Sequence, residues 1–346
     1  MSEEEPPGGQ SSNVLPTKST ETKCIGATNL KLHAITPAEV NLKTNYSQFT
    51  SNKKKYIVEL LSFHPPAFTG PELWGVVSQH CSGKSQSPIN IVTRRMRLGD
   101  DLTSFDFSGY QEAFHGRLVN TGHSVQLDLP VGMRIKGGNL TTPYKAVQLH
   151  LHWGKDGGPG SEHTIDGEQF PMEMHIVHIK EEYNSVSQAV RDSTGVAVLG
   201  FFFQKSKSAN NKFDPLLNAL KYITQPTNST TLKGVSLEML TLPEKNMTKY
   251  FRYHGSLTTP NCAEAVIWSL FENTVPLSSK QLAAFAQLQF SSGKPMVQTY
   301  RPVQPLSERQ VSYSRGHLAQ LNKVLLLTSV LVCTALSLST SFTTLL

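Results

Sequence analysis

Residues 196–203 read Val-Ala-Val-Leu-Gly-Phe-Phe-Phe, and this unbroken apolar run is typical of a strand buried on both of its faces. Outward from it, residues 125–129, 147–153 and 173–179 contain apolar and polar side chains in the alternating pattern of half-buried strands. Glycine-rich turns such as 157–160 separate these segments. The pattern therefore predicts a large sheet built from many short strands.

Helical periodicity is sparse in the same region, and its best examples are residues 213–223 and 278–287. No repeat of 20–50 residues is visible. We predict a mainly β (α+β) fold. It is a single domain built on a large, mostly antiparallel twisted central sheet with a few short peripheral helices.

Composition excludes several classes of protein. The chain has 346 residues, 17% of them charged, and a formal net charge of +6. It is neither collagen-like nor coiled-coil, and its four cysteines are too few for a disulfide-dense miniprotein. Basic residues are spread along the chain, with Lys53-Lys54-Lys55 as the longest run, so we expect no nucleic-acid partner.

Composition also divides the chain into four parts. Residues 1–62 are rich in Ser, Thr, Asn, Pro and Gly, and we expect a disordered or misassigned N-terminal extension there. Residues 63–308 form the globular domain, 309–323 a linker and 324–346 a hydrophobic tail. No charge interrupts that tail, which is long enough to span a bilayer.

The C-terminal pattern predicts a GPI anchor. Small residues at Ser312, Ser314 and Gly316 precede a polar spacer, 317–323, and then the hydrophobic tail, which GPI attachment removes. Ser312 and Ser314 are the two candidate attachment sites. A retained tail anchor and a buried helix are the alternatives.

Four N-glycosylation sequons favour the secretory route, and they begin at Asn45, Asn139, Asn228 and Asn246. No N-terminal signal peptide is visible, because no apolar stretch follows a basic start. We therefore expect the N-terminus of the secreted form to differ from Met1, and we place the protein at the extracellular face of the plasma membrane.

Histidines on two predicted strands indicate a metal site. His150 and His152 are two residues apart, so both face one side of a strand. Alone, such a pair is more often two histidines with ordinary hydrogen bonds. On the second strand, Glu173 shares a face with His175 and can accept its ring N–H, which favours His175 as the third ligand and His178 as a core residue. Three histidines with an open fourth position are typical of catalytic Zn²⁺.

These segments resemble the α-class carbonic anhydrases, and the membrane-anchored (GPI-linked), type IV-like members in particular. The matching motifs cover about Gly70 to Leu306 and occur in the family's order. They are QSPINI (86–91), NTGHS (120–124), HLHWG (150–154), GSEHTIDG (160–167), EMHIVH (173–178), GSLTTP (255–260) and RPVQPL (301–306).

The resemblance implies a role for each matching residue. His150, His152 and His175 would bind Zn²⁺. Thr258 would accept a hydrogen bond from zinc-bound hydroxide and donate one to Glu162, and His123 would shuttle the proton. The resemblance also implies a substrate pocket lined by Val177, Val198, Leu257, Thr258, Thr259, Val266 and Trp268. The residues that it implies behind the ligands and the Thr258 loop are Gln148, Glu173 and Tyr253.

In the type IV-like members, cysteines at the positions of Cys81 and Cys262 form a disulfide, so the resemblance implies that bond here. The chain departs from these members upstream of Gly70, where it has no local cysteine pair and no clear counterpart of a tyrosine on the cavity wall. Cys24 has no assigned partner, and Cys333 lies in the tail. This departure bears on the turnover rate and on the stability of the N-terminal part of the domain, and not on the zinc site.

The implied activity is the zinc-dependent, reversible hydration of CO₂ to bicarbonate and a proton, with bicarbonate transporters as partners by resemblance. A catalytically silent binding module is the alternative, although such modules typically lack a zinc histidine. A zinc hydrolase acting on esters is a further alternative.

Overall fold

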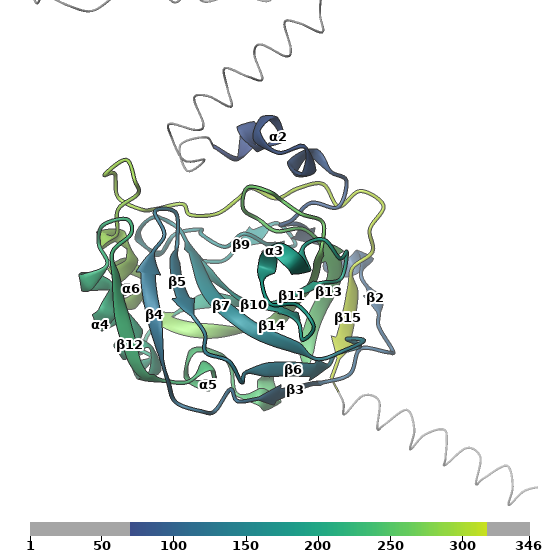
Figure 1. Ribbon diagram of the computed structural model, residues 1–346, viewed down its shortest axis with the longest axis horizontal. Helices are drawn as coiled ribbons and strands as arrows, with labels where there is room; N and C mark the ends of the chain where they lie inside the picture. The colour runs from purple at the N-terminus through teal and green to yellow at the C-terminus, as the bar shows by residue number, and fades with distance from the viewer. Residues whose placement is uncertain (1–69, 317–346) are drawn as a thin grey trace, which may run out of the picture. The chain divides into compact units, whose positions relative to one another are not determined.

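A twisted sheet of twelve strands forms the body of the computed structural model, which describes residues 70–316 (Figure 1). The strands follow the order β12-β4-β5-β7-β10-β11-β14-β13-β15-β2, with β3 and β6 branching from β7. Their bounds are β2 Arg97–Leu98, β3 Phe105–Ser108, β4 Phe114–Asn120, β5 Val125–Asp128, β6 Arg134–Gly137, β7 Tyr144–Trp153, β10 Met172–Lys180, β11 Val196–Ser206, β12 Ser229–Val235, β13 Lys249–Gly255, β14 Val266–Ser278 and β15 Ser312–Arg315.

Most neighbouring strands are antiparallel, and β11–β14 and β15–β2 are the parallel pairs among them. A second, three-stranded sheet contains β1 Asn90–Ile91, β8 Thr164–Ile165 and β9 Glu168–Gln169. The predicted fold class is confirmed. Strand β15 carries the sheet beyond residue 308, so residues 312–315 of the expected linker are strand, because the chain returns there to pair with β13.

Strand β11 shows why the central run is apolar throughout. Its residues alternate between two separate cores: Leu199 and Phe201 pack in the larger one, and Val198 and Phe202 in the smaller one. Both faces of the central strands are therefore covered, and a polar residue on either face would lie in a core.

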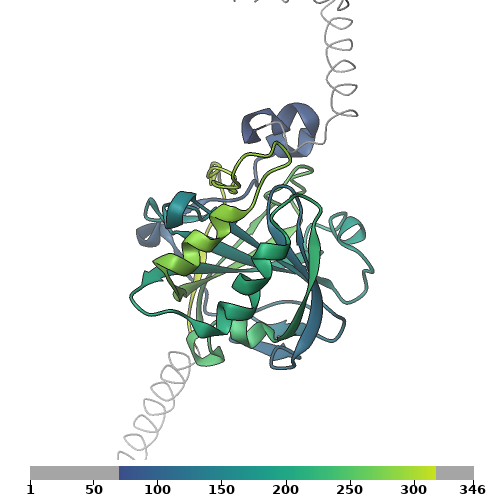
Figure 2. The same ribbon diagram turned by 90° about the vertical axis from the view of Figure 1, so that its left-hand side faces the viewer.

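Short helices cover the larger core. The segment predicted as residues 213–223 is split into η6 Asn211–Phe213, α4 Asp214–Ala219 and η7 Leu220–Tyr222, and the other predicted helix into α6 Ser279–Ala283 and η9 Ala284–Gln287 (Figure 2). A capping box between Ser278 and Gln281 starts α6. Among residues 70–316, no helix is long and apolar enough to cross a membrane.

The remaining helices are short peripheral turns. They are η2 Pro71–Leu73, α2 Trp74–Val77, η3 Gln79–Ser82, η4 Thr93–Arg95, η5 Lys155–Gly157, α3 Val186–Ala189, α5 Leu237–Leu240 and η8 Glu244–Asn246. Helices η2, α2 and η3 precede β1, and η3 contains Cys81, which lies next to the loop that follows β13.

The disulfide Cys81–Cys262 is present and links residues 181 positions apart. Closing a loop of that length stabilises the folded chain by at most about 5 kcal/mol in the chain-entropy description. Cys262 lies four residues after Thr258, so the bond also ties the Thr258 loop to the beginning of the domain.

A buried tyrosine–histidine pair lies on the larger-core side of β10. The His178 ring is fully buried, its Nε2 is 2.7 Å from the Tyr110 hydroxyl, and its Nδ1 is 3.3 Å from the Ala197 carbonyl. Burial lowers the pKa of His178 to about 4. This side chain is thus the core histidine that the alternation along the strand predicts.

We expect His178 to make stability fall in acid. Below pH 6.5 an unfolded chain protonates this histidine, whereas the folded chain keeps it neutral down to about pH 4. Relative to His178→Gln, the wild type should lose about 3 kcal/mol of unfolding free energy between these two pH values. Urea unfolding at a series of pH values measures the difference. Parallel losses in the two proteins would contradict the prediction.

Candidate active site

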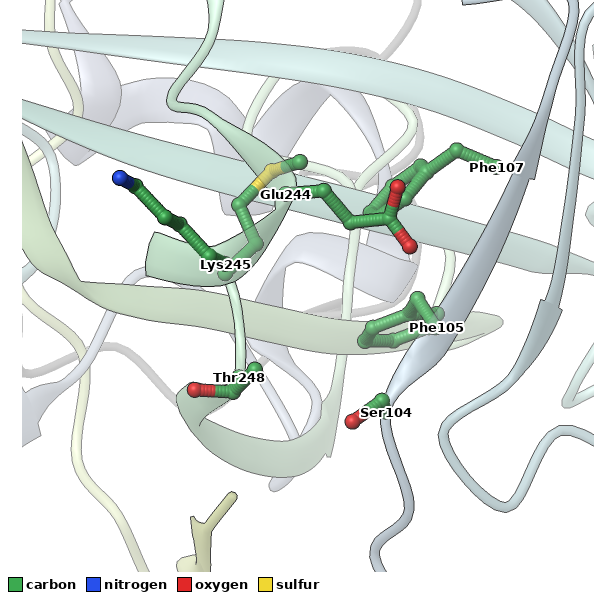
Figure 3. Close-up of a pocket in the computed structure, with 7 residues that line it drawn as sticks. Ser104, Phe105, Phe107, Glu244, Lys245 and Thr248 are labelled. Carbon is green, nitrogen blue, oxygen red and sulfur yellow. The ribbon is translucent and has the colours of Figure 1, made fainter. Parts of the chain in front are cut away.

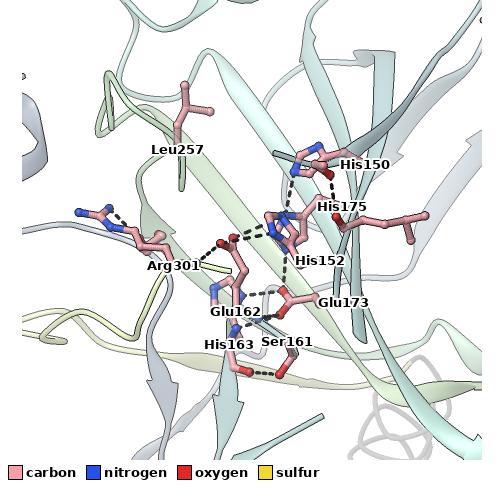
Figure 4. A network of polar contacts seen from close by, with 12 residues as sticks. His150, His152, Ser161, Glu162, His163, Glu173, His175, Leu257 and Arg301 are labelled. Atoms are coloured by element: carbon pink, nitrogen blue, oxygen red, sulfur yellow. Dashed lines mark hydrogen bonds and ion pairs between the residues drawn. The ribbon is translucent and has the colours of Figure 1, made fainter. Parts of the chain in front are cut away.

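Three histidine rings converge where β7 and β10 pair. The strand register places His175 directly opposite His150, and alternation along β7 puts His152 on the same face (Figure 4). The ring centroids lie 4.7 to 5.1 Å apart. Each ring offers one nitrogen, and these three nitrogens all lie within 4.8 Å of one another.

The outer nitrogen of each ring is held by an acceptor. His150 Nδ1 lies 2.9 Å from Gln148 Oε1, and His175 Nε2 lies 2.7 Å from Glu173 Oε1. His152 Nδ1 lies 2.7 Å from the Thr299 carbonyl. These acceptors fix each outer nitrogen as the N–H donor, so the inner nitrogen of each neutral ring keeps its lone pair.

The donor set suits a metal ion. The inner nitrogen of His152 is buried and has no hydrogen-bond partner. Burial is the main cause that lowers the pKa values of His150 and His175, and it favours neutral rings, the form in which imidazole binds metals. Three imidazole nitrogens without a cysteine are the ligands of catalytic Zn²⁺.

Glu173 organises the shell behind the histidines. Its fully buried carboxylate contacts His175 and also lies 2.7 Å from His163 Nδ1. The other oxygen accepts the backbone N–H groups of Glu162 and His163. Although burial raises its pKa, these two histidines hold the pKa of Glu173 well below its usual range. A Cβ at Gly200 would clash with Leu270 and contact this carboxylate.

His163, Glu173 and His175 also bring their ligand atoms within 4.8 Å of one another. Short hydrogen bonds to Glu173 already account for this proximity. We therefore interpret this group as the support of His175 and not as a second metal site.

Glu162 is placed by Arg301 as well as by Glu173. Its Oε1 accepts the backbone N–H of Arg301 at 2.8 Å, while its Oε2 is buried without a hydrogen-bond partner. The Thr258 hydroxyl is not hydrogen-bonded to Glu162 in the structure, so the expected link between them stays a prediction. Thr258 is itself buried, at 6% exposure, and the free Oε2 is the acceptor such a link would use.

Tyr253 braces the Thr258 loop from behind. Its hydroxyl lies 2.6 Å from His163 Nε2 and 2.8 Å from Ser87 Oγ. Ser87 and Ser256 then exchange two bonds, each from a backbone N–H to the other hydroxyl, at 2.9 and 3.0 Å. Tyr253 therefore reaches the loop through two serines and has no direct bond to Thr258.

The apolar residues expected around the substrate lie together. Val177, Val198, Val266 and Trp268 belong to the smaller core, and Leu257 packs against it. The Trp268 ring is 4.7 Å from the His175 ring, so this apolar wall reaches the histidines. Thr259 is half-buried beside Thr258.

His123 stands on a tight loop between β4 and β5. Asn120 fixes this loop: its Oδ1 accepts the Gly122 N–H, and its Nδ2 donates to the Thr224 and Gln289 carbonyls. Gly122 has φ +86°, a conformation that glycine adopts without strain. The His123 ring is exposed, yet nearby chain partly desolvates it, and this desolvation is the main cause that lowers its pKa.

Three further residues of this network have no role predicted from the sequence: His163, Thr299 and Arg301. His163 and Arg301 lie in motifs that match the family, and their place in these motifs could have indicated a role at the site. Thr299 contributes a backbone carbonyl from 147 residues away, which no pattern of side chains could reveal.

A pocket elsewhere in the domain contains none of the predicted site residues. It lies between the β3 region and the chain around η8, as Figure 3 shows. Its lining residues are Ser104, Phe105, Phe107, Glu244, Lys245, Met247 and Thr248.

Comparison with known proteins matches the sequence of this chain to one family. The family model of the eukaryotic-type carbonic anhydrases matches residues 69–315. Carbonic anhydrase 4 of Rattus norvegicus is 39% identical over 270 residues, 77% of this chain and 86% of the relative. Carbonic anhydrase 15 of Mus musculus is 36% identical, covering 71% and 80%. Carbonic anhydrase 12 of Homo sapiens is also 36% identical, covering 78% and 74%.

We expect Glu173→Gln to weaken Zn²⁺ binding by about 10- to 100-fold, because the variant loses the anionic acceptor that orients His175. Competition with a chromophoric chelator measures the dissociation constant. Glu168→Gln, which changes an exposed carboxylate on β9, is the matched control. Equal affinities of the two variants would contradict the role of Glu173.

Proposed function

The chain belongs to the eukaryotic-type carbonic anhydrase family and is a carbonate dehydratase, and we propose that it works with Zn²⁺ held by His150, His152 and His175 at the extracellular membrane surface. One observation carries the metal assignment. Each of the three rings has its outer nitrogen occupied by an acceptor and its inner nitrogen directed to a shared point.

Bound Zn²⁺ would supply a Lewis acid that lowers the pKa of water to about 7, so that a nucleophile exists at neutral pH. The apolar wall of Val177, Val198, Leu257, Val266 and Trp268 would hold uncharged CO₂ beside the histidines. It disfavours a charged ligand, because a buried charge needs a partner. Bicarbonate would therefore leave toward water.

Thr258 and Glu162 would orient the attacking oxygen. The free Oε2 of Glu162 can accept the Thr258 hydroxyl proton, which leaves the Thr258 oxygen as an acceptor toward the substrate. The buried backbone of Arg301 fixes the other carboxylate oxygen. Thr259, which is half-buried beside Thr258, would complete this polar side of the substrate site.

His123 would carry the released proton to bulk solvent. The loop geometry keeps its ring exposed, and its lowered pKa lets it give up a proton near neutral pH.

The proposed membrane location rests on the hydrophobic tail and on the resemblance to the membrane-anchored members. Residues 324–346 lie outside the described residues. Of the two candidate attachment sites, Ser314 suits the fold better than Ser312. Attachment at Ser312 would remove Tyr313, whose ring packs 5.2 Å from Phe251 and whose hydroxyl donates to Glu272. Attachment at Ser314 would keep both contacts. Bicarbonate transporters at the same membrane are the partners that this location would serve.

The silent binding module and the ester hydrolase are distinguished by turnover. We expect purified protein to hydrate CO₂ rapidly in stopped-flow measurements, and His150→Ala to lose this activity together with its zinc. His115→Ala, which changes an exposed histidine on β4, is the control and should keep both.

Zinc binding without CO₂ turnover in the wild type would favour the binding module. Ester cleavage without CO₂ turnover would favour the hydrolase.

His123→Ala tests the proton route separately. In weak buffer, turnover should fall by about 100-fold or more, because the relay to solvent is lost. Imidazole in solution should restore it, and the exchange of ¹⁸O between CO₂ and bicarbonate at equilibrium should stay unchanged. A fall in that exchange rate would show that His123 affects the chemical step instead.

A further inference from the structure

Three sequons of the chain lie among the described residues, and they differ sharply in geometry. We propose that Asn228 carries an N-linked oligosaccharide. This inference rests on the proposed extracellular location, because only the secretory route provides the glycosyl donor.

Asn228 has a fixed backbone and a free side chain. Its N–H donates to the Gln225 carbonyl at 3.1 Å, and its carbonyl accepts the Asn120 N–H at 3.0 Å. The residue is exposed, and its carboxamide makes no hydrogen bond to any residue between 70 and 316. A sugar on this nitrogen would extend into solvent without breaking a contact.

The remaining two residues of the sequon are compatible with this assignment. Ser229 is exposed and Thr230 is half-buried at the beginning of β12. Strand β12 ends the main sheet and pairs with β4 on one side. A glycan on Asn228, the residue immediately before β12, would be attached at the end of this edge strand, and exposed edge strands can pair with another chain.

The other two described sequons suit a glycan less well. At Asn139, the amide nitrogen that would carry the sugar lies 2.5 Å from Asp101 Oδ2. Asn246 is half-buried in η8, and it is followed by Met247, which is 5% exposed. A glycan at Asn139 would compete with this hydrogen bond, and the Asn246 side chain is less exposed than that of Asn228.

The modification is a group transfer from a lipid-diphosphate-linked oligosaccharide. The bond between Asn228 Nδ2 and the anomeric carbon forms, the bond from that carbon to the diphosphate oxygen breaks, and one amide proton leaves. The lipid diphosphate is the leaving group, and no oxidant or reductant takes part.

The placement has a consequence for the active site. The backbone of residues 227 and 228 is bonded to Asn120 in both directions, with Thr227 N–H donating to the Asn120 carbonyl at 2.8 Å. Asn120 in turn holds the His123 loop. The glycan would therefore be attached next to the segment that holds this loop.

The test expresses the full chain in mammalian cells and digests it with peptide-N-glycosidase F in H₂¹⁸O, which marks each released site as ¹⁸O-labelled Asp. Mass spectrometry then maps the sites. Asn228 should be labelled. Asn228→Gln and Thr230→Ala should each lose one glycan on a gel, whereas Thr230→Ser, which keeps the sequon, should retain it. CO₂ hydration should be unchanged in all three.

The outcomes separate the two proposals. Labelling of Asn139 or Asn246 without Asn228 would overturn this inference and leave the extracellular location intact, as would an unglycosylated protein at the cell surface. A protein that stays inside the cytosol with every sequon unmodified would overturn the location, and this inference with it.

Discussion

The register between β7 and β10 is the constraint on which the site depends. It sets His175 opposite His150 and Glu173 opposite His152, so two strands supply three rings and the carboxylate behind one of them. A shift of β10 by one residue would turn Glu173 and His175 to the face opposite His150 and His152. The alternation of side chains along each strand therefore puts the ligands of that strand on one face. The pairing of β7 with β10 then brings the ligands of the two strands together.

Buried polar groups then hold the rings in place. Glu173 is fully buried, yet its two oxygens contact His175, His163 and two backbone N–H groups. Such a network is rigid when every member has a partner and costly when one member is lost. The unpartnered atoms at its centre, His152 Nε2 and Glu162 Oε2, lie where the proposed chemistry needs a ligand and an acceptor.

Arg301 joins this centre to the beginning of the domain. Its backbone N–H reaches Glu162, and its guanidinium donates to the Gln86 side chain and to the Ser87 and Cys81 carbonyls. Cys81 is also bonded to Cys262 beside the Thr258 loop. The disulfide thus ties the segment around Cys81 to the Thr258 loop, and Arg301 ties the same segment to Glu162. The region in which this sequence differs from the type IV-like members lies just upstream of this segment.

The sequence by itself determined the strands, the sheet-rich class and the three histidines, because alternation and spacing are local properties of the chain. It also separated His175 from His178 by their opposite sides of one strand. The tertiary structure alone decided which strands are neighbours, that residues 312–315 add strand β15 to the sheet between β13 and β2, and that Thr299, His163 and Arg301 support the site. These contacts join residues 90 to 147 positions apart, and chain folding alone brings such residues within hydrogen-bond distance.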